Sequence, residues 1–235
     1  MTLYRLSPLV LQTLIWIPTR LVLKWFLHFK VRGLFNLTEL PRGVIFAVNH
    51  TSELDSILVP AALPFLSRFS PMFYTSREKS FYSRSGWRQR FYGGNFFKLW
   101  GAYPVGVGLK DYGKELLTHT KILRDGGSLC IFPEGRRSDN GRPMEPKGGV
   151  GYLALKTGAP VVPVGISGAF LLTLADFFGR RRRVILRFGR PMRKAEFLRE
   201  LGLTTLPANA EEPSPEDCKK IARLVMRKIT ELLSG

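Results

Sequence analysis

Short apolar runs recur along the chain, and each ends at polar, glycine or proline residues. Five of these runs have the length and composition of buried strands: 44–48, 71–74, 128–132, 161–164 and 184–188. Helical candidates fall between or after them: 56–67, 112–124, 147–157 and a helix that starts at Ser214-Pro215. This alternation predicts an α/β layered domain with a mainly parallel sheet flanked by helices.

Residues 3–29 are rich in Leu, Ile, Val, Trp and Phe. Their longest stretch without formal charge, Leu6 to Thr19, contains 14 residues, whereas about 20 apolar residues are needed to span a bilayer. No small-residue cleavage site follows, as a signal peptide would require. We expect a helical segment that lies in the headgroup plane and meets it through aromatic and basic side chains: Trp16, Arg20, Lys24, Trp25 and Phe26. The alternative is a pair of amphipathic helices packed on the protein's own core.

Polar side chains follow the run at 44–48, where a loop exposes them and the strand holds them in place. His50 can accept a proton near neutral pH, and the carboxylate of Asp55 can fix its tautomer. On one continuous helix these positions would lie about 140° apart, so contact requires His50 on the loop and Asp55 in the first turn of the next helix. The pair is a candidate for general base catalysis. Ser52 and Asp55 also fit a capping box, so a purely structural role for Asp55 stays open.

A second strand run, 128–132, leads into Pro133-Glu134-Gly135-Arg136-Arg137-Ser138. Together with Asn49-His50 and Asp55, this stretch resembles the signature motifs of the glycerolipid acyltransferase family, whose bacterial type is the lysophosphatidate (1-acyl-sn-glycerol-3-phosphate) acyltransferase. Blocks at 100–105 and 161–168 resemble two further motifs of the family, in the family's order. The resemblance covers the region from about residue 40 to about residue 170.

The resemblance implies acyl transfer from acyl-CoA or acyl carrier protein to the free hydroxyl of a lysophospholipid, most often lysophosphatidate. We expect no cofactor and no metal. It makes His50 the general base and Asp55 its orienting partner. It assigns Glu134 and Gly135 to the acceptor's glycerol phosphate and Arg137 to its phosphate, and we expect Ser138, Lys147 and Lys110 to take part in substrate binding as well. Lys147 lies beside glycines at the start of a predicted helix, and a helix N-terminus with a neighbouring cation is suited to bind a phosphate.

One position departs from the family's pattern. Val107 stands where the family usually has arginine, and Lys110 is the nearest cation downstream. This leaves another lyso-lipid acceptor open, for example an amino-acid-linked one.

We expect residues 1–32 to form the interfacial helical segment, 33–202 the catalytic domain, and 203–235 a linker with a C-terminal helix packed on that domain.

The formal charge of +18 calls for an anionic partner: nucleic acid, an anionic membrane or a phosphorylated substrate. Basic and aromatic residues are interleaved from Arg77 to Lys98, a mixture that suits single-stranded nucleic acid or a membrane interface. The lipid-enzyme motifs favour the membrane, so we expect a monotopic protein on the cytoplasmic face of the inner (plasma) membrane and no nucleic acid partner. Two cysteines and three histidines without close spacing predict neither a disulfide framework nor a zinc site.

Three other functions are compatible with parts of the sequence. A thioesterase would use His50 to activate water, and the sequence alone does not distinguish this activity from acyl transfer. A serine hydrolase would need a Gly-x-Ser-x-Gly elbow, but Ala169 replaces the last glycine at 165–169. A nucleic-acid-binding module would explain the charge, but not the combination of His50, Asp55 and Glu134 at strand ends.

Overall fold

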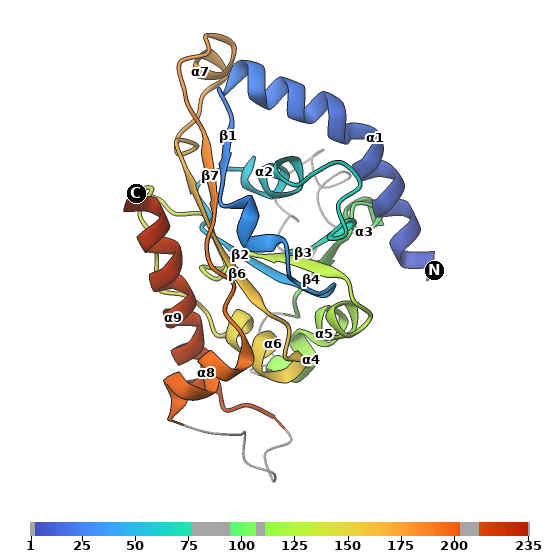
Figure 1. Cartoon of the computed structure of the whole chain (residues 1–235), viewed down its shortest axis with the longest axis vertical. Helices are drawn as coiled ribbons and strands as arrows, with labels where there is room; N and C mark the ends of the chain where they lie inside the picture. Colours follow the sequence, from blue (N-terminus) through green and yellow to red (C-terminus); the bar gives the residue numbers. More distant parts are fainter. Residues whose placement is uncertain (1–2, 77–94, 107–110, 203–211, 235) are drawn as a thin grey trace.

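The computed structural model describes residues 3–76, 95–106, 111–202 and 212–234 (Figure 1). Strands in these ranges form a sheet in the order β1-β7-β6-β2-β5-β3-β4. Their bounds are Lys30–Arg32 (β1), Ile45–Val48 (β2), Met72–Ser76 (β3), Ala102–Pro104 (β4), Ser128–Ile131 (β5), Val161–Ser167 (β6) and Ile185–Phe188 (β7). Among these described strands, β6 and β7 pair antiparallel and every other neighbouring pair is parallel. The prediction of an α/β domain with a mainly parallel sheet is therefore confirmed.

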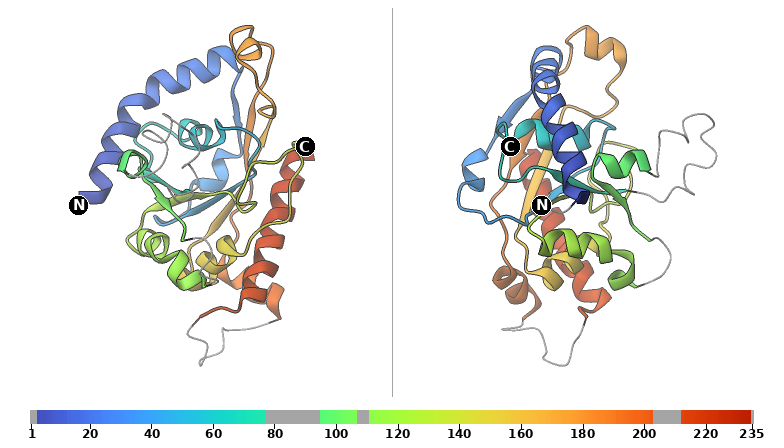
Figure 2. Two further views of the ribbon diagram at one scale, coloured as in Figure 1. Left: turned by 180° about the vertical axis from the view of Figure 1, so that it is seen from behind. Right: turned by 90° about the vertical axis from the view of Figure 1, so that its right-hand side faces the viewer.

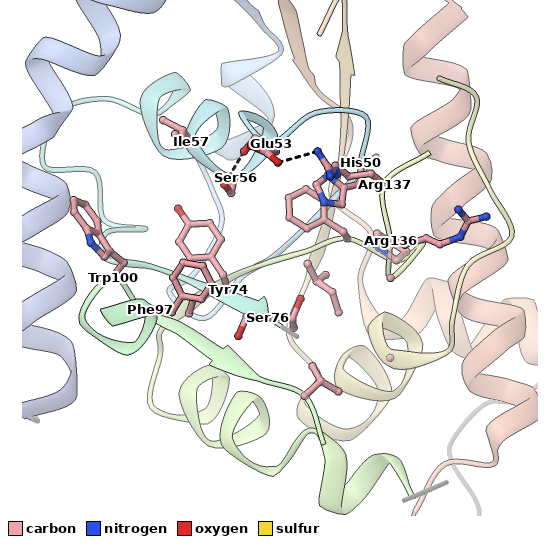
Figure 3. Close-up of a pocket in the computed structure, with 18 of the residues that line it drawn as sticks. His50, Glu53, Ser56, Ile57, Tyr74, Ser76, Phe97, Trp100, Arg136 and Arg137 are labelled. Carbon is pink, nitrogen blue, oxygen red and sulfur yellow. Dashed lines mark hydrogen bonds and ion pairs between the residues drawn. The ribbon is translucent and has the colours of Figure 1, made fainter. Parts of the chain in front are cut away.

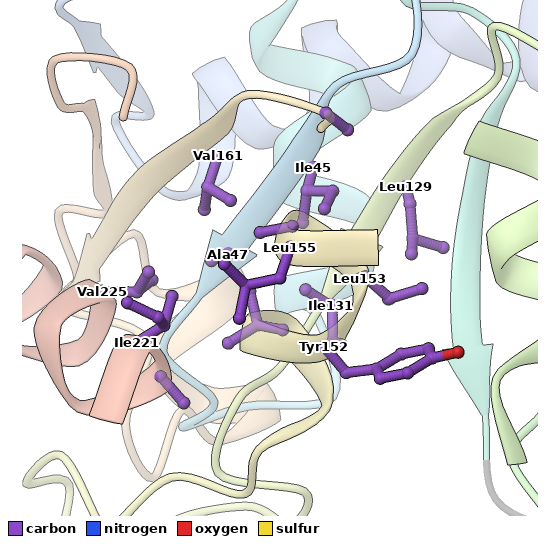
Figure 4. Close-up of a cluster of buried hydrophobic side chains, with 14 of the residues drawn as sticks. Ile45, Ala47, Leu129, Ile131, Tyr152, Leu153, Leu155, Val161, Ile221 and Val225 are labelled. Carbon is purple, nitrogen blue, oxygen red and sulfur yellow. The ribbon is translucent and has the colours of Figure 1, made fainter. Parts of the chain in front are cut away.

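β2 lies inside the sheet, between β5 and β6, and all four of its residues are buried. Ile45 and Ala47 point into one core, and Phe46 and Val48 into the other, because successive strand side chains alternate between faces. The first core, part of which is shown in Figure 4, packs against α5 (Leu117–Arg124), α6 (Gly149–Thr157) and α9 (Pro215–Ser234). The second lies under α1 (Leu3–Phe26) and α2 (Asp55–Ala62). Burial on both faces explains why β2 reads as a continuous apolar run.

The remaining described helices are short: η1 (Leu34–Leu37), α3 (Asn95–Leu99), α4 (Tyr112–Glu115), α7 (Leu174–Phe178) and α8 (Lys194–Leu201). The helix predicted at 56–67 ends at Ala62, because Leu63 precedes a proline and takes an extended conformation. The helix predicted at 112–124 is divided into α4 and α5 at Leu116. Residues 30–32 form β1 at the edge of the main sheet, so the helical part of the N-terminal segment ends at Phe26, short of residue 32.

α1 is a single helix that passes through Pro8 and Pro18 and runs along the outside of the domain (Figures 1 and 2). It replaces the pair of helices considered from the sequence. Side chains along its length hydrogen-bond the domain: Tyr4 to Asp125 at 2.7 Å, Gln12 to the backbone of Met72 at 2.8 and 2.9 Å, and Arg20 to the Ala61 carbonyl at 2.6 Å. By length and composition alone, Tyr4–Phe26 would be sufficient to cross a membrane.

The predicted interface residues lie on different faces of α1. Trp16 and Phe26 pack against aromatic rings of the domain, and Arg20 is held by the bond to Ala61, so these three do not face outward as expected. Lys24 and Trp25 are exposed. The outward face is instead a stripe of apolar side chains three or four positions apart: Leu6, Val10, Leu14, Ile17, Leu21 and Trp25.

α9 packs closely on α6. One face of α9 is buried, and it includes Cys218, Ile221, Ala222, Val225 and Ile229. At the closest approach, a Cβ added to Gly151 of α6 would lie 2.1 Å from the carbonyl oxygen of Cys218. A glycine is therefore required where the backbones of the two helices meet.

Replacing Gly151 by Ala is expected to lower the free energy of unfolding by about 1–3 kcal/mol, the usual effect of overpacking a core. The added methyl group meets backbone, so α6 and α9 must move apart. Gly149→Ala is the matched control in the same helix, because its Cβ would meet nothing closer than 3.6 Å. Thermal melting should show a lower Tm for G151A alone, and equal melting temperatures for the two variants would contradict this packing.

Candidate active site

The loop after β2 carries the candidate catalytic residues, and Asn49 fixes where it starts. The Asn49 side chain is buried and exchanges two hydrogen bonds with the backbone of Ile166 in β6, at 3.0 and 2.7 Å. These bonds extend the pairing of β2 with β6 by one residue through a side chain. His50 therefore leaves the sheet from a rigid point at the carboxyl end of the strand, where α/β sheets place their ligands.

His50 and Asp55 are in direct contact. The Nδ1 atom of His50 lies 3.0 Å from Oδ2 of Asp55, and the Asp55 side chain is 0% exposed. The same oxygen accepts hydrogen bonds from the backbone N–H groups of Thr51 (2.6 Å) and Ser52 (2.7 Å). Because a carboxylate oxygen only accepts, Nδ1 carries the proton and Nε2 of the neutral ring is left to act as a base.

This geometry matches the arrangement that the spacing required. His50 is on the loop, and Asp55 is the first residue of α2. The predicted capping box is not formed, because α2 is capped at Leu54 and the Asp55 N–H donates to the Ser52 carbonyl and not to its hydroxyl. The Asp55 carboxylate instead holds the turn by accepting the Thr51 and Ser52 N–H groups while it contacts His50. Phe132, the last residue of the predicted strand run, was not expected to be a site residue, but its ring stacks on the imidazole with 4.1 Å between ring centroids.

The second motif holds the backbone of His50 from both sides. Oε1 of Glu134 accepts a hydrogen bond from the His50 N–H at 2.8 Å, and the Ser138 N–H donates to the His50 carbonyl at 2.8 Å. The other carboxylate oxygen of Glu134 accepts from the Met144 N–H at 3.0 Å. Burial raises the pKa of this carboxyl, while the two N–H donors oppose that shift.

Glu134 and Ser138 are both buried, and neither lines the cavity. From the sequence both were expected to bind the acceptor, and their placement behind the cavity wall does not support that interpretation. Glu134 contacts backbone N–H groups, and the Ser138 hydroxyl contacts the Arg142 carbonyl and the Asn140 side chain, all in the loops that carry His50 and the arginines. Each therefore sets the position of residues that reach the cavity instead of reaching it itself.

Basic side chains do reach the cavity beside His50. Arg136, Arg137, Lys147 and the backbone of Gly135 all line it. Arg137 lies 3.1 Å from the carboxylate of Glu53, and both side chains are exposed (Figure 3). An exposed ion pair of this kind contributes little stability, so Arg137 can exchange Glu53 for an anionic ligand. Gly135 has a left-handed φ of +70°, and a Cβ there would lie 3.0 Å from the Lys147 side chain.

The cavity has a volume of about 1050 Å³ and changes character along its length. His50, Arg136 and Arg137 lie on one side of it, whereas Phe97, Trp100 and Ile57 lie on the other (Figure 3). Four residues of α1 complete the wall: Gln12, Ile15, Trp16 and Thr19. The arrangement offers a basic site for an anion, a histidine base, and an apolar region for a hydrocarbon chain.

Other sequence candidates lie elsewhere. Lys110 and Val107 fall outside the described residues, as does most of the basic and aromatic stretch that begins at Arg77. His119 is fully buried, does not line the cavity, and has its pKa lowered to about 4 by that burial. Within the described ranges, no group of three or more His, Cys, Asp or Glu residues could hold a metal ion.

Comparison with known proteins gives a consistent set of relatives. The profile of the acyltransferase family matches residues 28–167. Human 1-acyl-sn-glycerol-3-phosphate acyltransferase beta is 30% identical over 154 residues, which are 65% of this chain and 51% of the human protein. A 1-acyl-sn-glycerol-3-phosphate acyltransferase of Cocos nucifera is 42% identical over 50 residues, 21% of this chain and 16% of the plant protein. The chain thus spans about half the length of the human relative, and less of the plant one.

A solved structure shares the fold. The crystal structure of the 1-acyl-sn-glycerophosphate acyltransferase from Thermotoga maritima matches with a TM-score of 0.58 and 21% sequence identity. The match covers 93% of this chain and 79% of that protein. At this identity the similarity establishes the architecture, including the layered sheet and the apolar N-terminal helix.

Proposed function

Because the chain belongs to the acyltransferase family, we propose that it transfers an acyl group from an acyl thioester to the free hydroxyl of a lysophospholipid. The observation that carries this proposal is the His50–Asp55 pair, which opens into a cavity with basic and apolar regions. We propose lysophosphatidate as the acceptor, giving phosphatidate for phospholipid biosynthesis, with acyl-CoA or acyl carrier protein as the donor. The names of the human and plant relatives support this acceptor.

In the proposed mechanism, Nε2 of His50 takes the proton of the acceptor hydroxyl as its oxygen attacks the thioester carbonyl. A carbon–oxygen bond forms, and the carbon–sulfur bond then breaks. The imidazolium returns its proton to the departing thiolate, so that the products are an ester and a free thiol. Asp55 stabilises the imidazolium between these steps, and no acyl-enzyme is needed.

The charged and apolar regions of the cavity suit the two ends of such an acceptor. Arg137, Arg136 and Lys147 can neutralise a phosphate, and arginine does so with two parallel hydrogen bonds. The aromatic region around Phe97 and Trp100 suits a hydrocarbon chain. A different lyso-lipid headgroup is the alternative acceptor, because Val107 stands where the family usually has arginine. Val107 and Lys110 both fall outside the described residues.

Replacing Arg137 by Gln, or Lys147 by Gln, is expected to raise the KM for lysophosphatidate about tenfold with little change in kcat, because a phosphate contact is lost in ground and transition states alike. Arg142→Gln is the matched control, since Arg142 is exposed on the same loop but does not line the cavity. Steady-state kinetics with lysophosphatidate and with uncharged monoacylglycerol provide the measurement. An unchanged KM for lysophosphatidate in both variants would remove these residues from the acceptor site.

We also propose that the protein is monotopic and that α1 lies in the plane of the membrane. The polar bonds of Tyr4, Gln12 and Arg20 attach α1 to the domain along its length, and the apolar stripe from Leu6 to Trp25 faces away from it. A helix held in this way presents one face to the headgroup boundary. The net charge of +18 supports the cytoplasmic face, whose leaflet carries the anionic lipid.

A further inference from the structure

The connection between β6 and β7, residues 168–184, exposes large apolar side chains on an outer corner of the molecule. We refer to it as the α7 loop (Figures 1 and 2). Leu171, Leu174 and Phe178 are all more than half exposed, and Leu174 reaches 77%. None of these side chains lines the cavity, so the chemistry above does not account for them. Several exposed apolar side chains grouped in one loop mark an interaction surface.

The α7 loop has a defined structure that presents these side chains in fixed positions. Thr173 and Asp176 form a capping box, with each side chain accepting a hydrogen bond from the other's N–H at 3.0 and 3.3 Å. Arg182 lies 3.5 Å from the Asp176 carboxylate and donates to the Phe170 carbonyl at 3.3 Å. The loop is thus closed by polar contacts on its inside, while Leu171, Leu174 and Phe178 are exposed.

The α7 loop is continuous with the outward stripe of α1. The Phe177 ring stacks on Phe26 with 4.9 Å between centroids. Arg180 donates to the Trp25 carbonyl at 3.0 Å, and its guanidinium lies 4.5 Å from the centre of the Trp25 ring. Trp25 is the last member of the α1 stripe, so the two apolar surfaces meet at this residue.

Positive charge surrounds the apolar side chains of the loop. Arg180, Arg181 and Arg183 are exposed, and in the part of the chain that the structure describes Arg181 and Arg183 have no ion-pair partner. A second copy of this chain would place the same arginines against themselves in a two-fold contact. An anionic bilayer instead offers phosphates to the arginines and an acyl boundary to Leu174 and Phe178.

We propose that the α7 loop is a second membrane-contact element, which inserts Leu171, Leu174 and Phe178 at the headgroup boundary while Arg181 and Arg183 bind lipid phosphates. A helix lying in the membrane plane can roll about its own axis. A second contact beside the end of α1 prevents that rotation, and so fixes the direction in which the cavity faces the bilayer.

The direct test is a fluorescent probe on the loop. Both native cysteines are buried, so a dye that senses polarity can be attached selectively to Leu174→Cys. Leu117→Cys on α5 is the matched control, because Leu117 is also a highly exposed leucine, at 68%. On vesicles of phosphatidylcholine and phosphatidylglycerol, we expect a blue shift and protection from an aqueous quencher at position 174, and neither at 117.

A water-exposed label at 174 on protein bound to the vesicles would overturn the proposal, and so would failure of the full-length protein to bind them.

Arg181→Gln with Arg183→Gln should weaken vesicle binding about thirtyfold, because each arginine near an anionic surface contributes roughly fivefold. Lys219→Gln with Lys220→Gln, two exposed charges on α9, should have a much smaller effect. Equal losses in the two double variants would also contradict the proposal. Acyl transfer by L174C in detergent should match wild type, which separates this test from that of the proposed activity.

Discussion

Replacing His50 by Ala is expected to lower the rate of acyl transfer at least about 1000-fold, within the range that a general base contributes. The structure places Nδ1 of His50 against Asp55 and the ring at the cavity wall, so its other nitrogen is the group available to take the hydroxyl proton. The loss should fall on kcat, because lysophosphatidate is held by Arg137 and Lys147 in the proposed site. Thiol release from an acyl-CoA in the presence of lysophosphatidate measures it.

The interpretation of this loss depends on the fold of the variant. His50 is bonded to Glu134 and Ser138 through its backbone, which His50→Ala retains. We therefore expect a Tm within a few degrees of wild type. A correctly folded H50A protein that keeps more than a tenth of the wild-type kcat would exclude His50 as the base.

Replacing Asp55 by Asn is expected to lower kcat about 100-fold or more while the KM for the acceptor changes little. The amide oxygen can still accept the bonds from Thr51 and Ser52, so the turn is retained. It carries no charge, and it therefore stabilises the imidazolium form of His50 much less.

Ser52→Ala is the control for this variant. It removes the 3.2 Å hydrogen bond from the Leu54 N–H at the same turn and leaves the Asp55 carboxylate in place. We expect a modest loss of stability, about 1 kcal/mol, as for the loss of a cap, and kcat close to wild type. If S52A and D55N lose activity equally, Asp55 acts by shaping the turn and not through its charge.

The core of the sheet could be predicted because its strands are buried on both faces. β2, β5 and β6 therefore appear in the sequence as largely apolar runs, and the polar residues that follow β2 and β5 mark the ends of two neighbouring parallel strands. β1 and β4 could not be predicted in this way. Each has only three residues, partly exposed, and takes its structure from pairing with β7 or β3.

It was easier to predict which residues belong to the site than to predict which way their side chains point. The spacing of His50 and Asp55 was enough to require the loop and helix geometry that the structure shows. The side chain of Glu134 follows a strand in the same way, but it turns inward to bind backbone N–H groups. On α1, Trp16 and Arg20 were expected at the interface because of their composition, whereas helical spacing would have selected the stripe from Leu6 to Trp25. The aromatic region of the cavity comes from α3 and Trp100, which no local pattern connects to His50.

Thiol release from acyl-CoA by the purified protein in detergent, with and without lysophosphatidate, tests the central claim most directly. The account predicts release that depends on the acceptor, matches the phosphatidate formed, and is absent from the His50→Ala variant. Release of thiol and free fatty acid at the same rate without lysophosphatidate would contradict it, because His50 would then activate water and the protein would be a thioesterase.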